Sequence, residues 1–150
     1  MERLEPANQE CAREILEVVP MVMRTIRRQL RKHGAQFLSV PQFRTLGYVN
    51  RRKGASLSEV ADHIGLTLPS MSVLVDGLVE RNYVTRKTHP DDRRRMNLTL
   101  TARGETTLRL AREEAAVYIS RHLSRLPQTE RNMIHKAMRT LREVFPEEGD

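Results

Sequence analysis

The chain has 150 residues and a mass of 17.4 kDa, enough for one domain with a buried core and too little for two independent ones. Lys and Arg number 26 against 19 Asp and Glu, and the resulting formal charge of +7 indicates a polyanionic partner. A mean hydropathy of −0.56, with no apolar run long enough to cross a bilayer, excludes a membrane-spanning protein.

The first residues mix acids with bases and lack the apolar region and cleavage site of a signal peptide, so we expect a cytoplasmic protein. The single cysteine, Cys11, cannot form an internal disulfide, and the five histidines do not have the spacing of metal ligands. We therefore expect no metal and no cofactor. The absence of Trp, with three Tyr and three Phe, disfavours a stacking platform for single-stranded nucleic acid.

Helical periodicity starts near the N-terminus. Apolar residues at three- and four-residue steps predict a long helix from Asn8 to Gly34 with one apolar stripe. A second helix is expected over residues 41–51, with a proline near its start. Ser56 and Glu59 have the spacing of a capping box, which predicts a short third helix ending at Gly65. The stripe of the first helix consists of Cys11, Ile15, Val18, Val22, Ile26 and Leu30.

A fourth helix is expected from Thr67, as its cap, to about Asn82. Residues 83–87 and 96–100 read as two strands of a hairpin, and the polar loop between them should project into solvent. Two further helices are expected, one from residue 101 and one after Leu126-Pro127. Their expected inward residues are Leu108, Ala111, Ala115, Tyr118 or Ile119, and Leu123, followed by Met133, Ala137, Leu141 and Val144.

The expected fold is therefore mainly α with a small β-hairpin, in one domain over residues 1–150. Two short helices followed by a strand, a basic loop and a strand make a winged helix-turn-helix, which we assign to residues 40–100. This segment holds ten Lys and Arg against six Asp and Glu, or +4 of the total +7. The flanking segments, 1–36 and 101–146, supply long helices for dimerisation.

Three segments resemble the MarR (multiple-antibiotic-resistance regulator) family: LSEVADHIG at 57–65, MSVLVDGLVERNYV at 71–84 and PDDRRRMNLTLTARG at 90–104. The third segment is similar to the wing signature of the family. The resemblance covers nearly the whole chain. It implies a homodimeric DNA-binding regulator, held together by its outer helices, which in many members releases DNA when a small aromatic or lipophilic ligand binds.

The resemblance also implies roles for individual residues. Asp92 would brace the wing through an ion pair, and Arg94 would enter the minor groove from the wing tip. Many relatives carry an arginine on the exposed face of the recognition helix, where this chain has Val73 and then Gly77. We therefore expect contact between Val73 and thymine methyl groups, and a greater reliance on the wing.

These considerations define the sequence-based prediction: a sequence-specific regulator of double-stranded DNA, acting as a ligand-responsive repressor and as a homodimer on a palindromic operator. The expected DNA-binding residues are Thr67, Pro69, Ser70, Ser72, Val73, Arg86, Lys87, His89, Arg93, Arg94 and Arg95. The side chains offered for a ligand pocket are Met23, Phe43 and Tyr118.

Two alternatives stay open. The chain could be a winged-helix module that joins proteins without reading DNA sequence, since an arginine run is often only a solvated surface. Cys11 could be a redox sensor, as in a branch of the resembled family in which tyrosines of neighbouring helices activate a cysteine thiolate. No tyrosine of this chain lies in the segments that would supply them, and cysteine is commonly a buried apolar residue. An enzyme is disfavoured, because the sequence has no recognisable nucleophile and base, no phosphate-binding glycine loop and no metal-ligand spacing.

Overall fold

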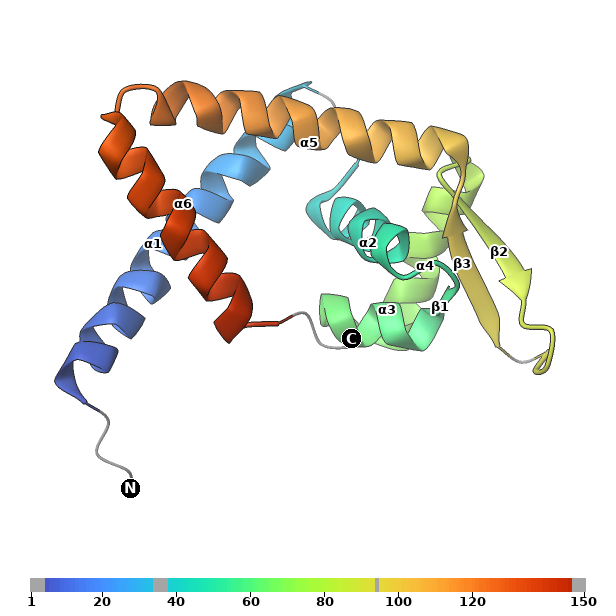
Figure 1. Ribbon diagram of the computed structural model, residues 1–150. Coiled ribbons are helices and arrows are strands. Elements are labelled where there is room, and N and C mark those ends of the chain that lie inside the picture. The colour runs from blue at the N-terminus through green and yellow to red at the C-terminus, as the bar shows by residue number, and fades with distance from the viewer. Residues whose placement is uncertain (1–4, 34–37, 94, 147–150) are drawn as a thin grey trace. The chain divides into compact units, whose positions relative to one another are not determined.

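The computed structural model describes residues 5–33, 38–93 and 95–146, with the backbone alone for 30–33 (Figure 1). The chain forms two compact units, Met1–Ala115 and Ala116–Asp150, which divide within one helix. In chain order the elements are α1 (Pro6–His33), α2 (Val40–Arg51), β1 (Ala55–Ser56), α3 (Leu57–Ile64), α4 (Leu68–Glu80), β2 (Val84–Thr88), β3 (Met96–Leu100), α5 (Ala102–Leu123) and α6 (Gln128–Val144).

The sheet is antiparallel, with strand order β1-β3-β2. The predicted hairpin is present, and β2 begins one residue later than expected, at Val84, which pairs with Leu100. A third strand was not predicted: Ala55 and Ser56 pair with Leu98 and Asn97. Two residues are too few to show the alternation of a strand in the sequence. The strand is recognised only because β3 pairs with it in the folded chain.

The core of the first unit lies between α2, α3, α4, the sheet and the first half of α5. Phe43, Leu57 and Leu74, on α2, α3 and α4, are half-buried at its edge. The helix α4 ends two residues earlier than expected, because Asn82 adopts a left-handed φ of 58°. The buried aliphatic and methionine side chains include Leu46, Val49, Val60, Ile64, Met71, Val75, Leu78, Val84, Leu98 and Leu108.

Helix α5 starts against Asn82 and Tyr83, the two residues that precede β2. The Thr101 N–H donates to the Tyr83 carbonyl (3.0 Å), and the Thr101 hydroxyl donates to the Asn82 carbonyl (2.6 Å). The Gly104 N–H donates to Thr101 Oγ1 (3.0 Å), which caps the helix, and Gly104 itself is buried. The guanidinium of Arg103 lies 5.0 Å from the centroid of the Tyr83 ring. This junction fixes the base of the hairpin to α5.

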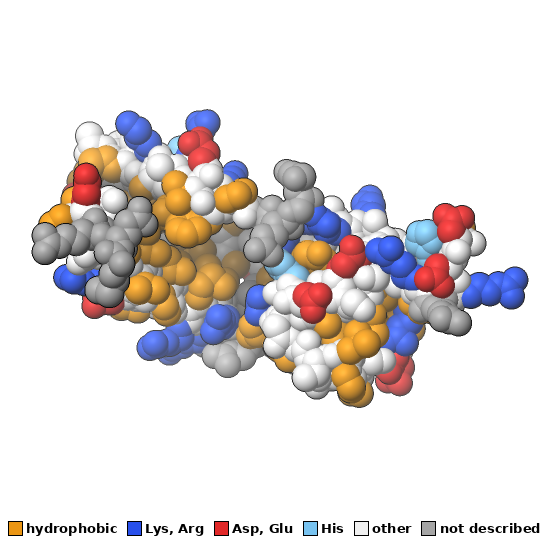
Figure 2. All heavy atoms as spheres, turned by 90° about the horizontal axis from the view of Figure 1, so that it is seen from below, with side chains coloured by type: hydrophobic (Ala, Val, Ile, Leu, Met, Phe, Trp, Pro, Cys, Tyr) orange, Lys and Arg blue, Asp and Glu red, His pale blue; other side chains and the backbone are white. Residues whose placement is uncertain are grey.

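The long helices carry apolar faces that the single chain does not cover. On α1 the valines of the predicted stripe, Val18 and Val22, are exposed. On α6 no residue is buried, and Met133 is 65% exposed. The prediction that Met133, Ala137, Leu141 and Val144 face inward is therefore wrong for a single chain, because only Leu141 is even half-buried. Figure 2 shows broad areas of hydrophobic side chains over the long helices.

Among the described residues, no helix combines the length and the apolar character that a bilayer-spanning segment needs.

Candidate nucleic-acid interface

Helices α3 and α4 form the helix-turn-helix. At the start of α3 the Glu59 N–H donates to Ser56 Oγ (3.3 Å) and the Ser56 N–H donates to Glu59 Oε2 (2.6 Å), so the predicted capping box is confirmed. The helix ends at Gly65, whose φ of 79° is left-handed and whose N–H donates to the Ala61 carbonyl (2.9 Å). Only residues 65–67 separate the two helices.

The start of α4 presents the predicted hydroxyl groups to solvent. Thr67 is the N-cap: its Oγ1 accepts from the Ser70 N–H (3.4 Å), and its hydroxyl donates to Ser70 Oγ (2.9 Å). Pro69 occupies the first turn, where its missing N–H costs no hydrogen bond. These three residues are exposed, Ser72 is half-buried, and Val73 is 73% exposed. The structure thus places the five expected residues in the cap and the first two turns of α4.

The wing extends from the sheet as a closed polar loop. The His89 N–H donates to the Arg95 carbonyl (2.8 Å), and the Arg95 N–H donates to the Asp92 carbonyl (3.0 Å). The side chains of Lys87 and Arg93 are exposed, and His89 is half-buried with its Nδ1 accepting from the Asp91 N–H (3.2 Å). Figure 2 shows Lys and Arg side chains protruding at the end where the wing lies. Arg94, the expected wing tip, lies outside the described residues.

Two arginines of the predicted set connect the wing to the helix-turn-helix. Arg86 on β2 pairs with Asp76 on α4 (2.7 Å) and donates to the Ser72 carbonyl (3.3 Å). Arg95 at the end of the loop pairs with Glu59 on α3 (3.4 Å). Each guanidinium has an acidic partner within the same unit, so part of its charge is already compensated.

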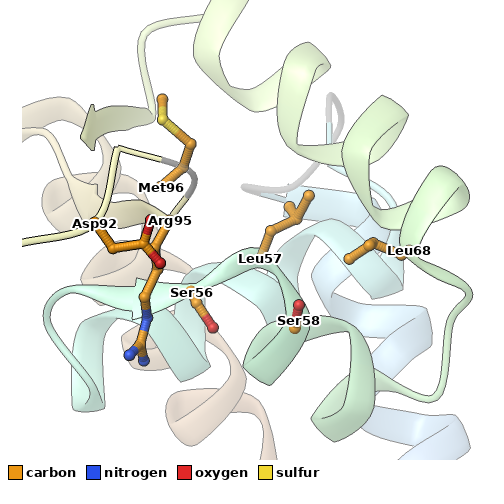
Figure 3. Close-up of a pocket in the computed structure, with 7 residues that line it drawn as sticks. All are labelled: Ser56, Leu57, Ser58, Leu68, Asp92, Arg95 and Met96. Atoms are coloured by element: carbon orange, nitrogen blue, oxygen red, sulfur yellow. The ribbon is translucent and has the colours of Figure 1, made fainter. Parts of the chain in front are cut away.

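A shallow cavity of about 320 Å³ lies where the wing meets the helix-turn-helix (Figure 3). It is lined by Ser56, Leu57, Ser58, Leu68, Asp92, Arg95 and Met96. The ion-pair bracing expected for Asp92 stays a prediction. The ion pair from Arg95 to Glu59 was missed by sequence reasoning. The capping box identifies Glu59, but only tertiary folding brings it to the wing.

The carboxylate of Glu59 has a pKa below its ordinary value of 4.5. The main cause is the hydrogen bond from the Ser56 backbone, followed by the Ser56 side chain, and Arg95 adds a smaller electrostatic contribution. A lowered pKa in the folded state means that ionisation of Glu59 favours folding. The contribution is fully present above the pKa of the unfolded chain and is lost as the pH falls through the folded value.

We expect Glu59→Gln to lower the free energy of unfolding at neutral pH and to have a smaller effect at a second pH below 4.5, where the carboxylate begins to protonate in the unfolded chain. Glutamine keeps the hydrogen bonds of the capping box but loses the charge that Arg95 faces. Urea unfolding of both proteins at the two pH values measures the difference. An equal difference at both would show that the charge of Glu59 makes no contribution.

The residues offered for a ligand pocket lie on three helices. Met23 is on the exposed part of α1, and Phe43 on α2 packs at the edge of the core. Tyr118 belongs to the second unit, where its ring lies 4.5 Å from the ring of His122, centroid to centroid. A pocket formed by these side chains stays a prediction. Cys11 is exposed on α1, and no cluster of metal ligands occurs within the ranges that the structure describes.

The capped helix pair, the exposed start of α4 and the basic hairpin define a winged helix-turn-helix protein. Residues 38–95 match the family model of the MarR family, which is the family that the sequence resembles. An uncharacterized HTH-type transcriptional regulator of Bacillus subtilis, YfiV, is 25% identical over 104 residues. The match covers 69% of this chain and 65% of that relative.

Solved structures share the fold over nearly the whole chain. RV1404 from Mycobacterium tuberculosis has a TM-score of 0.81 at 22% identity, covering 97% of this chain and 100% of that one. FabT from Streptococcus pneumoniae, solved in complex with DNA, has a TM-score of 0.67 at 18% identity and covers 91% and 96%. The expected fold class is therefore confirmed.

Proposed function

We propose that the protein is a sequence-specific, double-stranded DNA-binding transcriptional regulator. The observation that carries this proposal is that the start of α4 and the wing are exposed together, while two ion pairs tie the hairpin to the helix-turn-helix. A helix of this kind fits the major groove, and a basic hairpin beside it can reach the neighbouring minor groove. The structural likeness to a protein solved with DNA supports the same function.

Within this interface the residues divide into two roles. Thr67, Pro69 and Ser70 lie where backbone amides and short hydroxyls approach phosphate most easily. Lys87, Arg93 and Arg94 supply the positive charge of the wing, and His89 is proposed to contact DNA from the same loop. Arg86 and Arg95 hold the wing against α4 and α3, because each already pairs with a carboxylate.

We propose a homodimer, formed through the outer helices. Apolar residues on α1 and α6 recur at helical spacing and stay exposed in the single chain. A partner subunit that packs against these faces would bury them. A second copy also doubles the number of bases read. Two recognition helices related by a twofold axis would reach half-sites about 34 Å apart on a palindromic operator.

We further propose that the protein is a repressor and that a small aromatic or lipophilic effector releases it from DNA. The effector would contact Met23, Phe43 and Tyr118. The family resemblance supports both proposals. Selection of duplexes from a random pool tests the function as a whole. The proposal requires a palindromic site that is retained against excess unrelated duplex. A protein that retains no duplex selectively would instead be the protein-joining module.

Arg94→Ala is expected to weaken operator binding by on the order of 1–3 kcal/mol and to reduce the salt dependence of binding by about one phosphate contact. The physical reason is the loss of one charge at the tip of a hairpin that lies against the backbone of the duplex. Fluorescence anisotropy over a range of salt concentrations measures both quantities. Arg139→Ala, on an exposed position of α6, removes the same charge and should leave the slope unchanged. Equal slopes for Arg94→Ala and the native protein would contradict the role given to the wing.

A further inference from the structure

The recognition helix α4 carries no basic residue. All thirteen of its residues are described, and its only charged side chains are Asp76 and Glu80. Asp76 would repel phosphates, but its carboxylate is paired with Arg86 at 2.7 Å. The helix therefore has no cation of its own with which to contact a guanine or a phosphate.

The centre of the exposed face of α4 is apolar. Met71, Val75 and Leu78 point into the core, and Val73 lies on the opposite side of the helix, 73% exposed. One turn further along the same face is Gly77. Nothing in the core requires Val73 to be apolar, since its side chain projects into solvent.

Gly77 is half-buried, and its carbonyl accepts from Arg81 Nε (3.2 Å). A glycine inside a helix is less favourable than alanine, and Gly77 has no positive φ that would require it. A Cβ atom placed there would first meet Gln42 Nε2 at 3.8 Å, which is an ordinary contact. Alanine would therefore fit the folded chain.

We propose that Val73, with Gly77 beside it, reads the 5-methyl groups of thymines in each half-site. This inference rests on the proposed function and names the base feature that α4 recognises. The glycine lets the helix lie close to the base edges, and the valine then contacts a methyl group, the one apolar feature of the major groove. The charged wing contributes affinity of a kind that does not depend on sequence.

The test compares the selected operator with the same duplex in which deoxyuridine replaces thymidine, so that only methyl groups are lost. We expect the native protein to bind the deoxyuridine duplex about tenfold more weakly, for one buried methyl in each half-site. Val73→Ala should bind both duplexes equally. Val79→Ala, the same substitution elsewhere on α4, should keep the native discrimination. Equal binding of both duplexes by the native protein, when it still selects the operator over unrelated DNA, overturns this inference and leaves the proposed function standing.

Gly77→Ala gives a second test, in which the melting temperature is expected to rise and the operator affinity to fall. The melting temperature should rise by about 2–4 °C, because alanine favours the helix. Operator affinity should fall several-fold, because a methyl group now separates α4 from the bases. A higher melting temperature with unchanged operator affinity would overturn the role assigned to Gly77. A native protein that selects no duplex would overturn both this inference and the proposed function.

Discussion

Gly104→Ala is expected to destabilise the first unit by about 3 kcal/mol. A Cβ atom at this position would overlap the Tyr83 carbonyl oxygen and lie 3.0 Å from the carbonyl carbon. Both atoms are backbone, and the same carbonyl accepts the Thr101 N–H, so neither side of the contact can yield cheaply. Urea unfolding followed by circular dichroism measures the loss.

Gly47→Ala is the matched control, since Gly47 is also buried in a helix. The nearest atoms to a Cβ there are the ends of two flexible arginine side chains, Arg112 at 3.4 Å and Arg51 at 3.7 Å. These can move aside, so a small effect on unfolding is expected. Similar unfolding curves for Gly104→Ala and the native protein would show that α5 can shift away from Tyr83 without cost, which contradicts the junction described above.

Met138→Glu is expected to weaken self-association by about 3–5 kcal/mol, or about 100-fold or more, because each subunit would bury an unpaired charge. Met138 is 52% exposed in the single chain and lies on the apolar face of α6 that we assign to the dimer interface. A monomer offers one recognition helix, so operator affinity should fall with it. Sedimentation equilibrium measures the first effect and anisotropy the second.

His135→Glu places the same acid on α6, at an exposed position outside the apolar face, and should leave the dimer intact. If Met138→Glu sediments as the native protein does, α6 is not part of the interface. If it becomes monomeric but binds the operator with native affinity, the requirement for two recognition helices is wrong.

Local features of the fold could be predicted because they depend on neighbouring residues. Ser56 with Glu59, and Thr67 at the start of α4, satisfy backbone donors within one turn, so their spacing alone predicts where the helices begin. Alternating residues in 96–100 likewise predicted β3. The family resemblance placed these elements in the correct order.

Features that depend on distant residues could not be read in the same way. Ala55 and Ser56 become a strand only because β3 returns beside them. The sequence predicted that Arg86 and Arg95 contact DNA. It did not predict their ion pairs, because Asp76 and Glu59 are ten or more positions away and belong to α4 and α3. Periodicity on α6 predicted an apolar face correctly, but it does not specify whether the same chain or a second copy covers it.

The most direct measurement is the number of protomers bound to one selected operator, determined by sedimentation velocity, together with the affinity ratio against unrelated duplex of equal length. We predict two protomers on each twofold-symmetric site and an operator affinity at least about a thousandfold higher. A single protomer bound with equal affinity to every duplex would contradict the account.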